Sequence, residues 1–432
     1  MMLYQKELQI KYDVDVFVAG GGAAGVAAAL SAAREGKSVF LAEAMGCFGG
    51  LGTSGLVPAF APFTDGVNTV CDGVGKEIRD AASDEPLDTY WTQIDAEKLK
   101  LVYDKLLTEA GVSFSFFTTV TDVVVENDKI DYVVLNAKSG TFAAKAKIYI
   151  DCTGDGDLCA LAGGAFEQGD ENGQVMPATL CSTWVGADFN QIDRTVSDNA
   201  FIEDAYRAGI LSVCDRHLPG MFNRPDGISG GNVGHIFDMN PTDEVSVTEG
   251  MLRARKSLQE YQNYYRTYLK GYENVQMITT AAIPGIRESR RITCDYTLGL
   301  DDFINRATFP DEIGRYCYPI DIHVKNTSAE EYKRFTEEYE QNMRYKAGES
   351  YGIPYRSLIP VSFSNVLVAG RCMGCDQKMQ ASIRVMPGCF ITGQAAGVAA
   401  SLAADTGDVR SISVETLQDK LKEANAYLPN RK

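Results

Sequence analysis

The chain has 432 residues, 45% of them hydrophobic and 23% charged, a composition typical of a globular protein with two or three domains. Its formal net charge of −17 opposes binding to nucleic acids and to anionic membrane surfaces. The sequence shows no apolar run of membrane-spanning length, and residues 1–11 lack the apolar stretch of a signal peptide. Because the 11 cysteines lack the spacing of a disulfide framework, we expect reduced thiols and a cytoplasmic location.

Segment 15–25 is a β-branched run that ends in three glycines and continues into an alanine-rich stretch typical of a helix. Gly20 permits a tight turn out of the strand, and Gly22 lets a pyrophosphate approach the backbone at the helix N-terminus. Gly25 lets the helix pack closely on the sheet. Glu43 ends the next apolar run, at the spacing of a carboxylate that binds a ribose hydroxyl. Together these features predict a dinucleotide-binding βαβ unit.

The next hundred residues predict a helical region followed by a β-meander. Apolar residues recur at helical spacing within 74–110. Runs over 114–125 and 129–135 are typical of two strands joined by a hairpin at 127–128, and 142–151 predicts a third strand.

Residues 165–355 differ in character, with long loops and two aromatic helices. The capping boxes Ser246–Glu249 and Ser328–Glu331 predict where these helices begin. Large residues repeat along one face of each helix, which indicates a buried packing face rather than a cofactor-binding motif. They are Leu258, Tyr261, Tyr265, Tyr268 and Tyr272 in the first helix, and Tyr332, Phe335 and Tyr339 in the second.

A strand over 365–369 and a helix over 392–404 return the chain to an α/β pattern. Because this last strand needs a sheet to join, we predict that residues 1–164 and 356–432 form one α/β domain, a Rossmann-like parallel sheet with a β-meander. Residues 165–355 would form an inserted α+β substrate domain. We expect a small-molecule ligand between the two domains.

Several segments together resemble the FAD-dependent oxidoreductase family, which has a glutathione-reductase-like fold and is distantly similar to the flavoproteins of fumarate reductase and succinate dehydrogenase. These segments are 20–25 with Glu43, 49–53, 151–157, 284–291, 365–372, 381–387 and 392–397. The resemblance covers nearly the whole chain. It implies FAD, rather than NAD, as the resident nucleotide.

The resemblance also implies FAD-binding roles for individual residues. Glu43 would hold the adenosine ribose, Val120 would present its backbone to adenine, and the segment that starts at Arg384 would contact the isoalloxazine. Many members of the wider class carry Asp where this chain has Arg371, which would instead contact a phosphate. The helix that starts near Thr392 would stabilise charge on a reduced flavin, or would simply pack against its neighbours. The predicted cofactor-binding set is Gly20, Gly22, Ala23, Ala24, Gly25, Glu43, Gly49, Gly50, Thr53, Val120, Thr153, Gly154, Asp157, Gly370, Arg371, Arg384, Val385, Pro387, Gly393 and Ala395.

The candidate catalytic residues are His235, Arg287 and Arg290. His235 lies among glycines of the inserted domain and is either a proton carrier or a structural histidine. At helical spacing, Arg287 and Arg290 or Arg291 would share a face. The arginines would then bind a substrate carboxylate, or they would form an ion-pair network with Glu288.

Two further patterns bear on metals and thiols. Since only three histidines are present, His217, His235 and His323, we exclude a histidine-rich metal cluster and predict no metal site. Cys372 and Cys375 form a CxxC pair, which is either a redox dithiol or a pair of packing thiols.

The predicted activity is hydride exchange between flavin N5 and a small organic substrate, with carboxylate-bearing compounds as one class. A flavin monooxygenase and a non-catalytic or RNA-modification-linked flavoprotein are the alternatives. We expect neither a nucleic-acid nor a membrane partner, because of the net charge. The sequence leaves open the electron acceptor or donor, the direction of the reaction, covalent attachment of the flavin and the formation of homo-oligomers.

Overall fold

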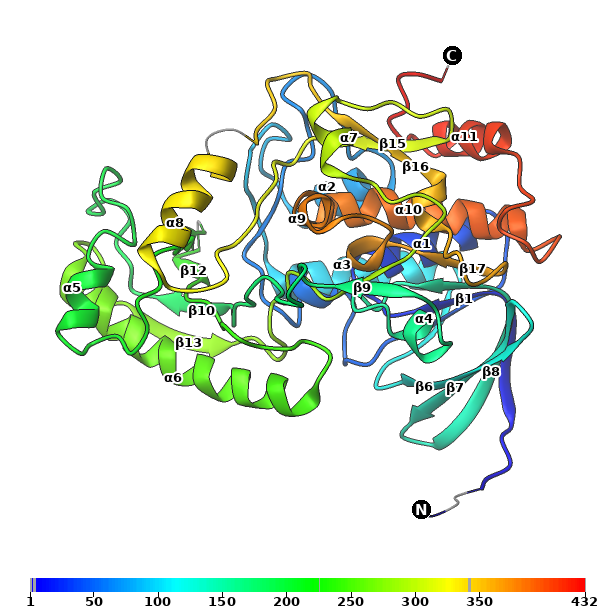
Figure 1. The fold of residues 1–432 in the computed structure, drawn as a ribbon, viewed down its shortest axis with the longest axis horizontal. Helices are drawn as coiled ribbons and strands as arrows, with labels where there is room; N and C mark the ends of the chain where they lie inside the picture. Colours follow the sequence, from blue (N-terminus) through cyan, green and yellow to red (C-terminus); the bar gives the residue numbers. More distant parts are fainter. Residues whose placement is uncertain (1, 3–4, 225, 341–342, 432) are drawn as a thin grey trace.

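The structure is a computed structural model that describes residues 2, 5–224, 226–340 and 343–431 (Figure 1). Its central sheet has the strand order β5-β2-β1-β8-β7-β6, and a seventh strand, β17, pairs with β8. The strands are β1 Ile10–Ala19, β2 Val39–Ala42, β5 Ser113–Ser115, β6 Thr119–Glu126, β7 Lys129–Ala137, β8 Gly140–Asp151 and β17 Val366–Val368. Strands β5, β2, β1, β8 and β17 run parallel, whereas β6 and β7 form an antiparallel meander with β8. The predicted Rossmann-like α/β fold is therefore confirmed.

The two ends of the chain meet in this sheet. Ala19 at the end of β1 lies beside Asp151 at the end of β8, and Val368 of β17 lies on the other side of Asp151. Because these strands are parallel, the loops that follow all three leave the same edge of the sheet. The prediction that the last strand joins the N-terminal sheet is confirmed.

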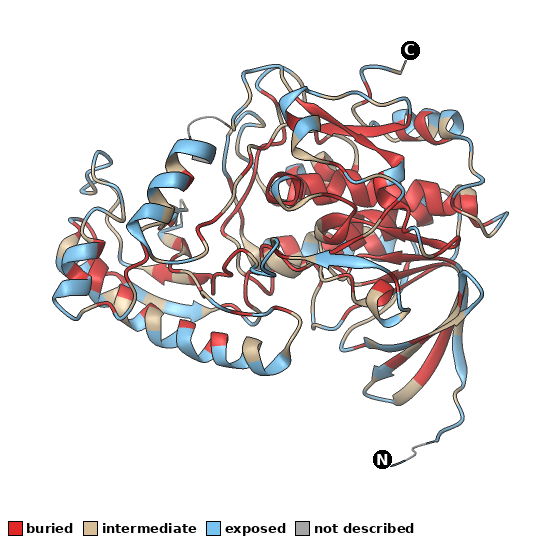
Figure 2. Ribbon diagram, in the orientation of Figure 1, coloured by how far each residue is buried: buried red, intermediate tan, exposed pale blue. Residues whose placement is uncertain are grey.

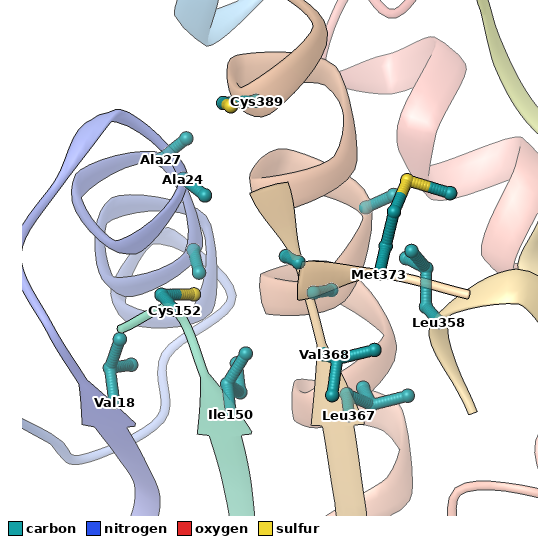
Figure 3. Packing of buried hydrophobic residues seen from close by; sticks show 14 of the residues in the cluster. Val18, Ala24, Ala27, Ile150, Cys152, Leu358, Leu367, Val368, Met373 and Cys389 are labelled. Atoms are coloured by element: carbon teal, nitrogen blue, oxygen red, sulfur yellow. The ribbon is translucent and has the colours of Figure 1, made fainter. Parts of the chain in front are cut away.

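Helices α1 (Ala23–Arg34) and α10 (Met386–Ala403) lie side by side against the sheet (Figure 3). A Cβ at Gly393 would come within 2.2 Å of the Ala24 carbonyl oxygen, and one at Gly397 within 2.2 Å of the Ala28 oxygen. Such backbone contact requires glycine on α10. Almost every residue of α10 is buried, and Figure 2 shows this helix in the interior of the sheet domain.

A second, smaller hydrophobic cluster contains buried residues between Ala178 and Ala281. It consists of an antiparallel sheet, ordered β11-β12-β10-β13, and the long helix α6 (Glu244–Tyr268). Its strands are β10 Ser182–Val185, β11 Gly220–Asn223, β12 Ile228–Asn232 and β13 Gln276–Thr280. Leu258, Tyr261, Tyr265 and Tyr272 are buried in this cluster, which confirms their predicted packing role. The side chain of Tyr339 lies outside the described part of the chain.

The predicted extent of the inserted domain, residues 165–355, remains a prediction. Most buried hydrophobic residues between Ile292 and Phe363 belong to the first cluster, with the sheet, and none of those described belongs to the second. The remaining elements are β3 Ala59–Phe60, α2 Val74–Ala82, β4 Thr92–Gln93, α3 Ala96–Glu109, α4 Asp157–Leu161, β9 Phe166–Gln168, α5 Ile202–Arg207, β14 Arg290–Ile292, α7 Leu300–Ile304, β15 Glu312–Tyr316, α8 Ala329–Phe335, β16 Tyr351–Pro354, α9 Gln377–Ile383 and α11 Val414–Glu423.

Three predicted elements near the start of the chain need correction. The single strand over 114–125 is two strands, β5 and β6, because Phe117 adopts a left-handed φ of 51° between them. The helical region 74–110 is two helices separated by β4. Helix α6 begins at Glu244, two residues before Ser246, since the carboxylate of Asp243 caps it by accepting from the Ser246 N–H.

Two corrections concern segments that bear on function. Arg290 and Arg291 lie in strand β14, which pairs with β9, so the helical spacing assumed for the arginines is wrong. The last long helix begins at Met386 rather than near Thr392, because Pro387 is compatible with a first helical turn. By contrast, the cap at Ser328 is confirmed, since its hydroxyl accepts from the Glu331 N–H.

Among the described helices, none is long and apolar enough on its own to cross a membrane. One bent pair, α9 with α10, meets the criterion of length and composition.

Candidate functional site

The turn between β1 and α1 shows what each glycine does. Gly20 has a φ of 85°, and Gly25 lies so close to Gly20 that an added Cβ would come within 1.8 Å of its carbonyl oxygen. Gly22, in contrast, has no atom within 4 Å of an added Cβ, because it faces a cavity. The N-terminus of α1 therefore presents bare backbone to that cavity.

A second glycine turn is attached to the first. The Gly49 N–H donates to the Gly21 carbonyl oxygen at 2.8 Å, with Gly49 at a φ of 104°. A Cβ at Gly50 would lie 3.3 Å from the Gly22 Cα. Thr53 lies behind this turn, where its buried hydroxyl donates to the Phe48 carbonyl oxygen at 2.5 Å. Thr53 therefore shapes the turn and does not line the cavity.

Glu43 is held rigidly at the end of β2. Its two carboxylate oxygens accept from the Gly21 N–H at 2.6 Å and from the Met45 N–H at 2.7 Å. Burial raises the pKa of Glu43, although these N–H groups oppose the shift. The carboxylate borders the same cavity as Gly22.

The loop after β8 brings further polar groups to the cavity. The buried carboxylate of Asp151 accepts from the backbone N–H and the hydroxyl of Thr153, which holds the loop against the sheet. Arg371 forms an ion pair with Asp155 at 2.8 Å and also donates to Ser289. A Cβ at Gly154 would come within 2.7 Å of the Arg371 guanidinium, so the arginine lies over this glycine.

The cavity between these loops has a volume of about 380 Å³. The structure places most of the predicted cofactor-binding residues on its wall. These are Gly20, Gly22, Ala23, Ala24, Glu43, Gly49, Gly50, Val120, Thr153, Gly154, Asp157, Gly370, Arg371 and Arg384. Gly25, Thr53, Pro387, Gly393 and Ala395 do not line it, and Val385 lines a neighbouring cavity.

The start of α10 approaches the cavity through Met386 and Cys389 rather than through Gly393. Gly393 packs against α1, which is the alternative that the sequence left open for this helix. The wall also contains Asp155, which lies within the motif at 151–157 but was not predicted to bind the cofactor, and Pro241 and Val247, which no sequence signal marks.

Comparison with models of known protein families identifies the family of this chain. The family model described as FAD dependent oxidoreductase matches residues 15–421. The chain belongs to the FAD dependent oxidoreductase family. None of the curated proteins matches the sequence.

Solved structures that resemble this FAD dependent oxidoreductase share little sequence with it. A geranylgeranyl bacteriochlorophyll reductase-like protein from Thermoplasma acidophilum is 13% identical, with a TM-score of 0.48 over 95% of this chain and 83% of that chain. The p-nitrophenol 4-monooxygenase PnpA from Pseudomonas putida is 12% identical, with a TM-score of 0.42 over 96% and 85%. The flavin-dependent brominase Bmp2 is 11% identical, with a TM-score of 0.46 over 96% and 84%.

FAD is the cofactor of this family, and the cavity residues fit it. Gly22 leaves the N-terminus of α1 open to an anionic group, as a pyrophosphate requires. The carboxylate of Glu43 borders the cavity as an acceptor for a ribose hydroxyl.

The oxidoreductase has a second cavity, of about 470 Å³, which shares Leu51, Ile286, Arg384 and Met386 with the first. Trp91 and Tyr318 contribute aromatic surface to it, with their rings 6.0 Å apart. Because the two cavities share wall residues, a molecule in the second lies next to the FAD cavity.

Arg287 lies on the wall of this second cavity and is 7% exposed. Its guanidinium donates to Thr179 Oγ1 and to the Pro177 carbonyl oxygen at 2.9 Å each, and to Asn232 Oδ1 at 3.3 Å. Within the described part of the chain it forms no ion pair with a carboxylate. Burial, and then the charge of Arg384, lower the pKa of Arg287 to about 10.

The other two arginines of the predicted cluster differ from Arg287. Arg290 pairs with Asp157 at 2.8 Å, and Arg291 pairs with Glu288 at 2.9 Å. Neither arginine lines the second cavity. Arg291 thus forms the ion pair with Glu288 that the sequence offered as the alternative, whereas Arg290 pairs with a carboxylate from another segment.

The side chain of His235 is buried and does not line either cavity. Its Nδ1 lies 2.9 Å from Asp215 Oδ2, and its Nε2 lies 2.7 Å from His323 Nδ1. His323 and His217 do line the second cavity, and their rings stack at 4.5 Å. The sequence argument against a histidine cluster does not hold, because all three histidines lie together.

The CxxC cysteines do not have the surroundings of a reactive dithiol. Cys372 and Cys375 are both buried, and neither lines either cavity. Burial raises the pKa of both thiols, which disfavours the thiolate needed for exchange.

Proposed function

We propose that this FAD dependent oxidoreductase exchanges a hydride between FAD and a small organic acid whose carboxylate binds Arg287. Bound FAD supplies a hydride acceptor or donor at N5 of its isoalloxazine ring. The observation that carries the proposal is a buried guanidinium that has no carboxylate partner among the described residues, on the wall of a cavity that adjoins the FAD cavity.

Physical chemistry favours an anionic ligand at this position. A buried charge without a counter-ion is costly, and the lowered pKa of Arg287 reflects that cost. Arg384, on the same wall, already pairs with Asp321 at 3.0 Å. Of these two arginines, Arg287 is therefore the one whose charge a substrate carboxylate would neutralise, by accepting two hydrogen bonds from it.

The remaining wall residues would orient and dehydrate the acid. Trp91 and Tyr318 offer apolar faces to its carbon skeleton, and expulsion of water strengthens the pairing with Arg287. A carboxylate fixed at one end holds the reacting carbon at a constant position relative to the FAD cavity.

The test is anaerobic bleaching of the bound flavin by a panel of hydroxy acids and dicarboxylic acids, in the wild type and in three variants. Arg287→Gln should keep its flavin spectrum but raise the KM for the active acid about 10- to 100-fold, the loss expected for a charge-assisted pair. Arg287→Lys should lie in between, because it keeps the charge and loses the fork. Arg356→Gln, on an arginine half-exposed at the surface, is the matched control and should behave as the wild type.

An unchanged KM in Arg287→Gln would refute the assignment of Arg287. Oxygen uptake driven by NAD(P)H, without bleaching by any acid, would favour the flavin monooxygenase. A gel shift of tRNA would favour the RNA-linked alternative, which the net charge of −17 opposes.

A further inference from the structure

All three histidines of the 432-residue chain lie together at the second cavity, with His217 and His323 on its wall and His235 behind them. His217 precedes β11, His235 follows β12, and His323 follows β15, so three separate segments bring them together. One ring nitrogen from each lies within 4.8 Å of the other two. Hydride transfer to a carboxylic acid does not require such a group.

Two of the three rings, those of His235 and His323, each have a carboxylate next to their outer nitrogen. Asp215 Oδ2 lies 2.9 Å from His235 Nδ1, and Asp321 Oδ2 lies 3.5 Å from His323 Nε2. Each outer nitrogen therefore faces a carboxylate, which leaves the inner nitrogens, His235 Nε2 and His323 Nδ1, facing each other at 2.7 Å. Histidines that bind metals have this arrangement, because a carboxylate on the outer N–H fixes the tautomer and orients the ring.

A count of protons shows where a cation would fit between the two rings. Two neutral imidazoles carry one N–H each, yet the chain from Asp215 through His235 and His323 to Asp321 contains three contacts. If both outer nitrogens donate to their carboxylates, two lone pairs meet between the rings. A third proton or a metal ion can fill that place, and a metal ion does so without charging either ring.

The third histidine supplies a free ligand atom. His217 Nδ1 is buried and has no hydrogen-bond partner among the described residues.

We propose that His217, His235 and His323 bind one divalent transition-metal ion of the Zn²⁺ class at the wall of the second cavity. Imidazole suits Zn²⁺, Cu²⁺, Fe²⁺ and Ni²⁺ better than Mg²⁺ or Ca²⁺. Three protein ligands leave at least one coordination position, as in catalytic zinc sites, and the second cavity gives that position access to a small molecule.

The distances require a modest adjustment. Tetrahedral bonds of about 2.05 Å hold neighbouring ligand nitrogens about 3.3 Å apart. The 2.7 Å pair would therefore open by about 0.6 Å, and the His217 ring, which stacks on that of His323 at an interplanar angle of 22°, would turn so that its nitrogen points at the ion. Arg287 and Arg384 oppose a cation here, whereas the carboxylates of Asp215 and Asp321 favour it.

The experiment measures metal content in the FAD-loaded protein, and its outcome does not depend on hydride transfer. Elemental analysis after dialysis should show about one transition-metal ion per chain. Protein stripped with a chelator should take up one Co²⁺, with absorption bands at longer wavelengths than those of the flavin. Added Zn²⁺ should also raise the melting temperature of the stripped protein in proportion to the logarithm of its concentration.

Variants separate the ligands from their surroundings. His217→Ala and His323→Gln should lose the ion while keeping the flavin spectrum. Asp215→Asn should weaken binding about 10- to 100-fold, as expected for a carboxylate behind a ligand. Asp198→Asn is the control, because Asp198 is a partly buried carboxylate that accepts a hydrogen bond from Tyr265, and no contact with a histidine is present among the described residues.

Two results would overturn the proposal. If the wild type contains no ion, takes up no Co²⁺ and is not stabilised by Zn²⁺, the histidines share a proton instead. If His217→Ala binds the ion as tightly as the wild type, the three-histidine site is wrong. The Zn²⁺-dependent melting of the wild type needs no variant, so a poorly folding variant does not weaken the test.

Discussion

Replacement of Gly22 by Ala separates cofactor binding from folding. An added Cβ meets no protein atom within 4 Å, and the φ of −66° at Gly22 suits alanine, so the apoprotein should lose less than about 1 kcal/mol, the cost of a poorer N-cap. The methyl group would, however, occupy the space through which an anionic group reaches the N–H groups of α1. Loss of one hydrogen bond to a charged group costs about 1.5–3 kcal/mol, which raises the Kd for FAD about 10- to 100-fold.

The assay titrates apoprotein with FAD and follows the quenching of flavin fluorescence, with thermal melting of the apoprotein as the second readout. Gly25→Ala is the informative contrast, since its Cβ would lie 1.8 Å from the Gly20 carbonyl oxygen. That variant should lower the melting temperature of the apoprotein itself, because overpacking costs about 1–3 kcal/mol or more. Wild-type FAD affinity in Gly22→Ala would refute the view that this backbone contacts the cofactor.

Three further predictions use the same protein. Glu43→Gln should raise the Kd for FAD roughly tenfold without changing the circular dichroism spectrum, and an unchanged Kd would remove Glu43 from the ribose site. Leu367→Ala, in the fully buried strand β17, should lower the free energy of unfolding in urea by about 2–5 kcal/mol, and a loss below 1 kcal/mol would mean that the joint between the chain ends is loosely packed. Burial and the charge of Asp155 raise the pKa of Asp157 from 3.8 to about 6. Between these two pH values the folded state holds a proton that the unfolded state has released. The free energy of unfolding should therefore fall as the pH rises through this range. The effect should be small, because 49% of the side chain is exposed. Asp157→Asn should abolish it in melting curves recorded from pH 4 to 7. An identical pH profile in the wild type and the variant would contradict this prediction.

The FAD cavity could be predicted from the sequence because its signals are local. Gly20 needs a positive φ, and Gly22 and Gly25 need the absence of a side chain, and each requirement applies within a few residues of the motif. The parallel arrangement of β1 and β8 then brings the turns together, since both strands end at the same edge of the sheet. The ends of the helices were less predictable. Helix α10 begins at Met386 with Pro387 in its first turn, and a proline at this place in the sequence is equally compatible with a loop.

Most of the second cavity could not be predicted: Arg287, Arg384 and Val385 on its wall lie in recognisable motifs, but the histidines and aromatic residues that complete it carry no local signal. Arg287 and Arg290 stand three residues apart, yet one faces the second cavity and the other pairs with Asp157, since the chain becomes the strand β14 between them. The histidines show the same limit more strongly, because His235 and His323 are 88 positions apart in the chain and touch only through the tertiary fold. A low histidine count argues against a metal site only if the histidines are scattered in space. Here all three histidines lie within one cluster, so their low number is no argument against a metal site.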